Sequence, residues 1–208
     1  MMKDMKIDEF IKLLSSDAAV PGGGGAAGLV AGIGMSLGNM VCALTTGKKK
    51  YAEYQEEIEE SIVKANDITE RLLACMDKDA ESFEPLSKAY GLPKNTDEEI
   101  AKRNEIMEKA LVTATEAPLN MMSVIYEALE LLSRLAVIGS RMAISDVGVG
   151  LQMCKAAMHG ASLNVYINTK LMKNRDYAEG YNAKADKLIA DADKIADEAY
   201  KLVIDAIR

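Results

Sequence analysis

The 208-residue sequence has little of the chemistry that metal-binding and disulfide-bonded proteins use. It contains one histidine, His159, no C-x-x-C pair, and three cysteines, Cys42, Cys75 and Cys154. An odd number of widely spaced cysteines does not make a disulfide framework, which favours free thiols in a reducing cytoplasm. A structural zinc site needs about four Cys or His ligands. We therefore expect no metal site and no tightly bound cofactor.

Aromatic residues, basic charge and β-rich runs are also scarce. The chain has no tryptophan, 5% aromatic residues, and 25 basic against 32 acidic side chains, which gives a net charge of −7. Nucleic-acid binding needs a basic face, so this charge argues against it. An apolar composition rich in alanine and methionine suits closely packed helices instead.

One long stretch lacks charge altogether. Residues 18–47 contain no charged side chain, and Pro21 and four glycines lie near their start. A membrane span needs roughly 20 predominantly apolar residues, but glycine and alanine dominate here, and Ser36, Asn39 and Thr45 are polar. No basic segment of the kind that opens a signal peptide precedes the stretch. We therefore expect no association with a membrane.

The glycines also fail as a nucleotide-binding loop. Gly23, Gly25 and Gly28 match G-x-G-x-x-G, but that fingerprint needs a preceding strand and a strand–helix alternation, and no β-rich run occurs. Gly47 and the following lysine resemble the end of a phosphate loop, but Cys42 stands where its first glycine belongs. Neither nucleotide motif is complete.

The remaining interpretation is a helix that starts after Pro21-Gly22-Gly23-Gly24 and packs closely on its neighbours. Repeated glycine costs about 0.5–1 kcal/mol per residue relative to alanine in a helix, so it indicates close packing or a ligand. The unpaired N–H groups of a helix start suit a polar or anionic ligand. A flexible turn is the simpler alternative for the glycines. Lys48, Lys49 and Lys50 can complement the helix dipole at the other end.

Apolar residues recur at helical spacing through the rest of the chain. Pro118 either starts a helix or kinks a continuous one, and Gly139-Ser140 interrupts the pattern. The sequence predicts one all-α domain, residues 1–208, built as a bundle of long antiparallel helices. Besides the glycine-led helix, these are expected at about 7–14, 51–90, 96–116, 121–138, 142–168 and 177–207.

Two aspartates fall among apolar residues. Asp79 follows the helical stripe of Leu72 and Met76, and Asp146 is the only charge between Arg141 and Lys155. Burial of a carboxylate raises its pKa toward the range that is useful in acid–base catalysis. The structural alternatives are an ion pair of Asp79 with Arg103 or Arg141, and a helix N-cap at Asp146.

Three further polar residues lie in the apolar part of the chain. Asn164 and Asn168 are one helical turn apart and could bind a heterocycle, although links between neighbouring helices explain them equally well. Asn164 is eighteen residues from Asp146, about 27 Å along a continuous helix, so one small reacting centre cannot touch both. His159 is expected in a packing role rather than a catalytic one.

Taken together, these residues resemble the cyclodeaminase/cyclohydrolase family of folate enzymes, over nearly the whole chain. The order and spacing of the motifs carry the resemblance. They are Pro21-Gly22-Gly23-Gly24, Gly47-Lys48-Lys49-Lys50-Tyr51, Asp79…Phe83, Leu92-Pro93-Lys94, Arg103, Ala117-Pro118-Leu119, Ser145-Asp146 and Asn164…Asn168. The chain departs from the family at Gly25, where relatives commonly have serine, and at Ser140, where they often have asparagine.

The resemblance implies an all-helical homodimer that binds tetrahydrofolate near the subunit interface. Its chemistry would lie at the bridge between N5 and N10. We expect hydrolysis of 5,10-methenyltetrahydrofolate to 10-formyltetrahydrofolate. The alternatives are cyclisation of 5-formiminotetrahydrofolate with release of ammonia, and a non-catalytic helical protein that only oligomerises.

The same resemblance suggests roles for individual residues. We hypothesise that Asp79 or Asp146 transfers the proton while the other orients or stabilises the cationic substrate. The implied substrate-binding residues are Pro21, Gly22, Gly23, Gly24, Lys48, Lys49, Lys50, Arg103, Asn164 and Asn168, with the lysines expected to bind the glutamate tail.

Overall fold

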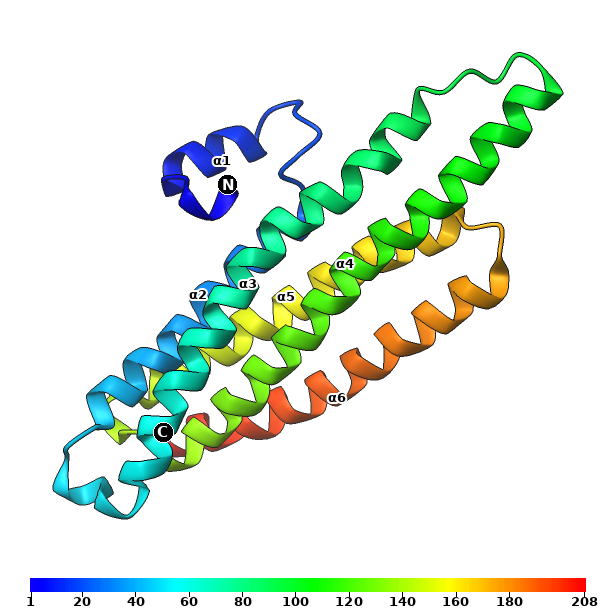
Figure 1. Cartoon of the computed structure of the whole chain (residues 1–208). Helices are drawn as coiled ribbons and strands as arrows, with labels where there is room; N and C mark the ends of the chain where they lie inside the picture. The colour runs from blue at the N-terminus through cyan, green and yellow to red at the C-terminus, as the bar shows by residue number, and fades with distance from the viewer.

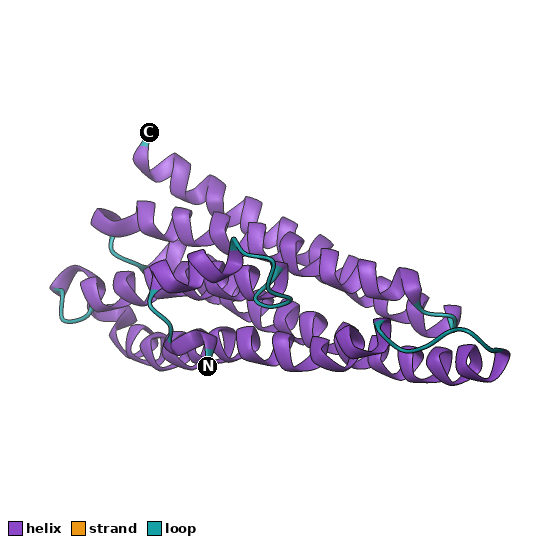
Figure 2. Ribbon diagram, turned by 90° about the horizontal axis from the view of Figure 1, so that it is seen from above, coloured by secondary structure: helices purple, strands orange, loops and turns teal.

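The computed structural model describes residues 1–208 and contains helices but no strands (Figure 2). The main helices are α1 (Ile7–Leu14), α2 (Gly23–Thr45), α3 (Gln55–Tyr90), α4 (Asp97–Ile138), α5 (Ile144–Leu171) and α6 (Arg175–Ile207). Short 3-10 helices cover Met2–Asp4, Lys49–Tyr54 and Arg141–Ala143. The predicted all-α bundle of long helices is confirmed, and α2 to α6 run alongside one another (Figure 1).

Helix α2 packs against both α3 and α5. Small residues allow this close approach, since a methyl group at Gly28 would lie 3.1 Å from the Leu72 carbonyl oxygen, and one at Gly34 would lie 3.0 Å from the Gly150 carbonyl oxygen. By length and mean hydropathy, 1.7, α2 alone meets the criteria for a membrane span. Half of that window is buried in the bundle, as expected for a core helix.

Helix α4 resolves the two alternatives for Pro118. The helix continues through this residue to Ile138, so Pro118 does not start a new helix. Its N-terminus is closed by a capping box: the Thr96 hydroxyl accepts from the Glu99 amide at 3.2 Å, and the Glu99 carboxylate accepts from the Thr96 amide at 3.3 Å. The predicted interruption at Gly139-Ser140 is confirmed, because α4 ends there.

The start of α2 divides the bundle into two parts. Along the length of α2, the five helices α2 to α6 share one large apolar core. Beyond the N-terminal end of α2, the bundle consists of α3, α4, α5 and α6 alone, and these helices enclose a second, smaller apolar cluster. The residues of that cluster are Leu86, Ala110, Leu111, Ala114, Met172 and Ala178. Polar groups at the start of α2 therefore lie at the boundary between a five-helix and a four-helix region (Figure 1).

The residues before α2 form a small N-terminal arm that lies beside α3 (Figure 1). The Met2 amide donates to the Asp77 carboxylate at 2.5 Å. Phe10, which is buried, would lie 3.9 Å from a methyl group at Gly25, and Pro21 would lie 3.1 Å from it. The arm is thus seated on α3 and on the first turn of α2.

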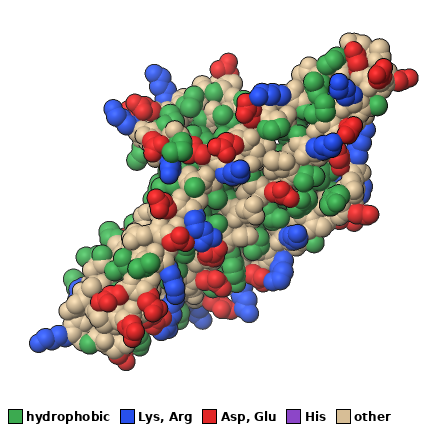
Figure 3. All heavy atoms as spheres, viewed as in Figure 1, with side chains coloured by type: hydrophobic (Ala, Val, Ile, Leu, Met, Phe, Trp, Pro, Cys, Tyr) green, Lys and Arg blue, Asp and Glu red, His purple; other side chains and the backbone are tan.

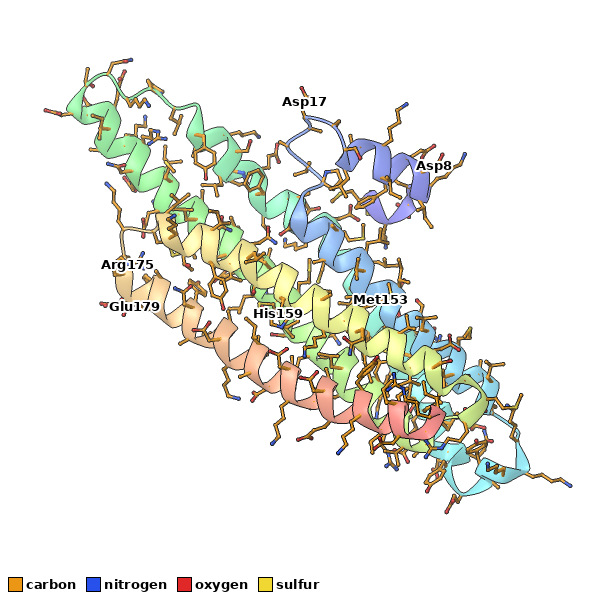
Figure 4. The ribbon with its side chains drawn as sticks, turned by 180° about the vertical axis from the view of Figure 1, so that it is seen from behind. Asp8, Asp17, Met153, His159, Arg175 and Glu179 are labelled. Atoms are coloured by element: carbon orange, nitrogen blue, oxygen red, sulfur yellow. The ribbon has the colours of Figure 1, made fainter.

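The outer faces of the bundle differ in polarity. Acidic and basic side chains are interspersed over the face formed by α3 and α4 (Figure 3), where Arg71 binds Glu127 and Arg134 binds Glu57 through paired hydrogen bonds. The opposite face contains α5 and α2 (Figure 4). Its exposed apolar residues include Ile33, Met40, Leu44, Val149, Leu163 and Ile167.

Candidate active site

The first turn of α2 presents free backbone donors. Gly22 is the N-cap, and the first intrahelical bond runs from the Ala26 amide to the Gly22 carbonyl. The amides of Gly23, Gly24 and Gly25 therefore have no acceptor within the chain. Because the N-terminal end of a helix is also the positive end of its dipole, this turn favours a negatively charged or polar neighbour.

Asp79, from α3, is that neighbour. A methyl group at Gly24 would overlap the Asp79 carboxylate, so the glycine lets the carboxylate lie against the α2 backbone. Burial alone accounts for the pKa shift of Asp79, with no contribution from a hydrogen bond or a nearby charge, so the pairs with Arg103 and Arg141 considered from the sequence do not form. Desolvation by burial raises the pKa of Asp79 to about 6. The expected upward shift is confirmed, and a carboxyl that titrates near neutral pH can both accept and return a proton.

Asn164, from α5, lies on the other side of the same turn. Its side-chain oxygen and nitrogen would both be 3.6 Å from a methyl group at Gly23. The nitrogen donates to the Gly160 carbonyl at 3.1 Å, so the oxygen remains available as an acceptor. Asp79, Gly23, Gly24 and Asn164 thus come together, although they lie on three helices.

Asn168 has the structural role that was the alternative for it. It is buried, and its side-chain nitrogen donates to the Ala114 carbonyl on α4 at 2.8 Å. His159 is exposed rather than part of the core, and its Nε2 lies 2.8 Å from the Asp193 carboxylate on α6 (Figure 4). Both residues link α5 to a neighbouring helix.

The predicted lysines lie at the opposite end of α2. From Gly24 to Thr45 the helix rises about 32 Å, and Lys48, Lys49 and Lys50 follow Thr45. This distance is greater than the length of a folate with one glutamate, so within one chain the lysines cannot hold the tail of a substrate bound at Gly24. Within one chain, the predicted substrate-binding residues therefore lie at two separate places, one at each end of α2.

Polar groups at this second end largely satisfy one another. Lys48 Nζ donates to the Ser140 hydroxyl at 3.1 Å, and the Ser140 amide donates to the Thr45 hydroxyl at 2.9 Å. The Tyr51 hydroxyl accepts from the Arg141 amide at 2.9 Å, and this bond lowers the pKa of Tyr51. We call these five residues the lysine corner.

Asp146 belongs to the same end of the molecule. It lies in the first turn of α5, and α5 is continuous to Asn164, so about 27 Å separates these residues along the helix. Asn164 and Asp79 both lie against the first turn of α2. Asp146 is therefore far from Asp79, and the two aspartates cannot act on one reacting centre within one chain. A site that uses both aspartates would need Asp146 from a second copy of the chain.

Sequence reasoning missed the residue that seats the N-terminal arm beside the site. Asp77 accepts the Met2 amide, and its second carboxylate oxygen is buried without a partner. Two residues before Asp79, it lies on a different helix face. No motif marks Asp77, and its partner is 75 residues away.

Comparisons with known proteins agree with this architecture. The family model described as formiminotransferase-cyclodeaminase matches residues 6–187. A methenyltetrahydrofolate cyclohydrolase of Methylorubrum extorquens is 39% identical over 197 residues, which cover 95% of each chain. The formimidoyltransferase-cyclodeaminase of Gallus gallus is 30% identical over 88% of this chain, which spans 34% of that longer protein.

A solved structure shows the same fold. The crystal structure of formiminotetrahydrofolate cyclodeaminase from Thermotoga maritima matches with a TM-score of 0.89 over the full length of both chains, at 22% identity. The fold and the relatives therefore place the protein among all-helical enzymes. More particularly, the chain belongs to the formiminotransferase-cyclodeaminase family, which confirms the resemblance found in its motifs.

Proposed function

We propose that the protein hydrolyses 5,10-methenyltetrahydrofolate to 10-formyltetrahydrofolate. The carrying observation is the unpaired Asp79 carboxyl, with a pKa of about 6, against the free amides of α2 and next to Asn164. The name of the M. extorquens relative supports this reaction, because that protein matches over nearly its entire length. The relatives carry the names of enzymes, so a purely structural role is not favoured.

In the first proposed step, water adds to the methenyl carbon that joins N5 and N10. The Asp79 carboxylate accepts one proton from that water, which creates a hydroxyl-bearing tetrahedral carbon bonded to both nitrogens. The negative carboxylate also stabilises the cationic amidinium of the bound substrate. Because the pKa of Asp79 is about 6, most of the carboxyl is ionised and ready to act as a base at pH 7.

In the second step, the Asp79 carboxylic acid returns the proton to N5 as the bond between the carbon and N5 breaks. The hydroxyl group loses its proton to solvent as the carbonyl forms, and the formyl group remains on N10. One water is consumed and one proton is released in total. The Asn164 side-chain oxygen and the free α2 amides are placed to position the polar heterocycle. These steps need no tightly bound cofactor, and we propose that they take place in the cytoplasm.

The second candidate reaction is cyclisation of 5-formiminotetrahydrofolate with release of ammonia. The names of the G. gallus relative and of the T. maritima structure favour it. N10 would attack the formimino carbon and lose its proton to the Asp79 carboxylate. The resulting carboxylic acid would return that proton to the formimino nitrogen, which departs as ammonia. Both reactions pass through a tetrahedral carbon between two nitrogens, so one carboxyl serves either.

We also propose that residues 1–208 act as one cyclodeaminase/cyclohydrolase-like domain and that two copies form a homodimer through the α2 and α5 face. Helix α2 contains no charged residue, and a helix that is apolar on all sides is normally buried. An apolar hollow of about 510 Å³ adjoins this face between α5 and α6, and its lining includes Val30, Met153 and Tyr200. A two-fold axis through the middle of the face would bring the Gly24 end of one copy to the lysine corner and Asp146 of the other.

The test is to incubate the protein separately with the methenyl and the formimino substrates and to follow methenyl absorbance. Decay of the methenyl compound faster than in buffer supports the hydrolase. Growth of absorbance with equimolar ammonia from the formimino compound supports the cyclodeaminase. If neither signal differs from buffer, both proposed reactions are wrong.

A further inference from the structure

Arg103 on α4 is a half-buried cation without a partner. Its Nε is buried and makes no hydrogen bond. Arg71 and Arg134 each bind a glutamate carboxylate through two hydrogen bonds, and Arg175 donates to two carbonyls at the end of α5. A guanidinium that is partly removed from water normally finds such an acceptor, because an unsatisfied buried donor destabilises the protein. The Nε of Arg103 therefore has no acceptor within the chain.

The obvious intrahelical partner is engaged elsewhere. Glu99 lies four residues before Arg103, which is the spacing of a helical ion pair. Its carboxylate instead accepts from the Asn95 amide at 2.7 Å and from the Thr96 amide at 3.3 Å, and so closes the start of α4. The capping box thus leaves the guanidinium free for an acceptor from outside the chain.

Arg103 and Asp79 lie in the same half of the molecule. Leu86 of α3 and Ala110 of α4 belong to one apolar cluster, and the two helices are antiparallel. Asp79 is seven residues from Leu86 in one direction, and Arg103 is seven residues from Ala110 in the other. At 1.5 Å per residue, Arg103 and Asp79 are about 20 Å apart along the bundle. This region is the one that α2 does not reach.

The two charges match the two ends of an elongated folate. Asp79 is the negative group for the cationic methenyl bridge, and a guanidinium is the preferred partner of a carboxylate because its donors form a planar fork. We propose, on the basis of the proposed function, that Arg103 binds a carboxylate of the glutamyl tail. This assigns to Arg103 the contact that the sequence suggested for the lysines, which within the same chain are about 32 Å from Gly24, at the other end of α2.

The test compares two substrates in one assay: the methenyl derivative of tetrahydrofolate, and the same derivative without glutamate, made from tetrahydropteroate. For the tail-bearing substrate, Arg103→Gln should raise KM by about 10-fold to 100-fold, the range for one lost charge-assisted bond, while kcat stays within about two-fold. For the substrate without glutamate, wild type and variant should have the same KM. Arg103→Lys, which retains the charge but not the fork, should fall between wild type and Arg103→Gln.

Two control variants separate this contact from general charge. Lys102→Gln removes an equal charge from the neighbouring, exposed position and should leave both KM values unchanged. Lys48→Gln tests whether a partner's lysine corner holds the tail instead. The proposal is overturned if Arg103→Gln affects both substrates equally, or if the dependence on the tail is lost in Lys48→Gln and retained in Arg103→Gln.

Other outcomes are also informative. If Arg103→Gln changes the mass measured by light scattering and leaves KM unaltered, the anion belongs to another copy of the chain, and the proposal is wrong. If wild type turns over neither substrate, the proposed function fails. If wild type is active and shows no preference for the tail-bearing substrate, only the assignment of Arg103 fails.

Discussion

The two ends of α2 both contain polar groups, but these groups are hydrogen-bonded to one another at one end and unpaired at the other. At the lysine corner, Lys48 binds Ser140, Ser140 binds Thr45, and Tyr51 accepts from the Arg141 amide. At the Gly24 end, the amides of the first turn and the carboxylate of Asp79 remain without hydrogen-bond partners in the chain.

This difference separates stability from chemistry. Groups that satisfy one another fix the connection between helices and have little free capacity for a ligand. Unpaired groups at a partly buried position destabilise the fold by their desolvation, and they recover that interaction only with a bound substrate. We therefore expect substitutions at the Gly24 end to reduce turnover and those at the lysine corner to reduce stability.

The largest effect is expected from Asp79→Asn, which keeps the size of the side chain and removes its proton transfer. Turnover of the methenyl substrate should fall at least about 100-fold, the scale of lost acid–base catalysis. Steady-state absorbance measurements give the rate. Glu81→Gln, an exposed acid on the same helix, is the matched control and should retain wild-type turnover. Near-normal activity of Asp79→Asn would remove the distinction between the two ends.

Asp146→Asn tests whether the far end contributes through a second copy. We expect a loss of turnover of about 100-fold, as for Asp79→Asn. If each site takes Asp79 from one copy and Asp146 from the other, a heterodimer of the two variants has one intact site. Equal mixing, after dissociation and reassembly, should then recover about a quarter of wild-type activity. No recovery in a verified heterodimer would show that Asp146 does not act across the interface.

Gly24→Ala tests the close approach itself. The added methyl group would overlap the Asp79 carboxylate and force it to move. Displacement of a catalytic group by about 1 Å can reduce turnover by 10²-fold, so we expect a loss of about 10-fold to 100-fold. Gly180→Ala is the control, because a methyl group there meets no atom within 4 Å. In the interior of α6 it should raise stability by about 0.5–1 kcal/mol and leave turnover unchanged.

Much of this arrangement follows from local sequence signals. The helical stripe predicts Asp79 among apolar residues, and the glycines predict a close-packed α2 with a free first turn. The predicted interruption at Gly139-Ser140 ends α4. Each of these features depends on contacts between residues a few positions apart, which periodicity and capping rules describe.

The grouping of residues from different helices could not be predicted in the same way. The family motifs place Asp79, Asp146 and Lys48 in one ordered series, but the fold sends them to opposite ends of α2. Only the antiparallel packing of α2 on α3 and α5 decides that Gly24 meets Asp79 and Gly23 meets Asn164. The Met2 contact with Asp77 likewise depends on the path of the whole N-terminal arm.

A smaller effect is expected in the dependence of stability on pH. The pKa of Asp79 rises from 3.8 to about 6 on folding, so the folded state holds this proton more tightly than the unfolded state. The free energy of unfolding should therefore decrease as the pH rises from about 4 to 6, and above pH 6 the whole of this decrease is present. At pH 7.5, Asp79→Asn should be more stable than wild type by roughly 1–3 kcal/mol. Urea unfolding at pH 4 and pH 7.5 measures both differences, and a gap independent of pH would contradict the assigned shift.

The smallest effect is expected at the lysine corner, from Ser140→Ala. The Ser140 hydroxyl is buried and accepts from Lys48 Nζ at 3.1 Å. Its loss should lower the free energy of unfolding by about 0.5–1.5 kcal/mol, the net value of one hydrogen bond, while turnover stays within about two-fold of wild type. Urea unfolding and the absorbance assay on the same preparation give both values. The opposite result, unchanged stability with a large loss of turnover, would mean that the lysine corner is part of the reacting site and that the two ends of α2 do not differ in the way argued above.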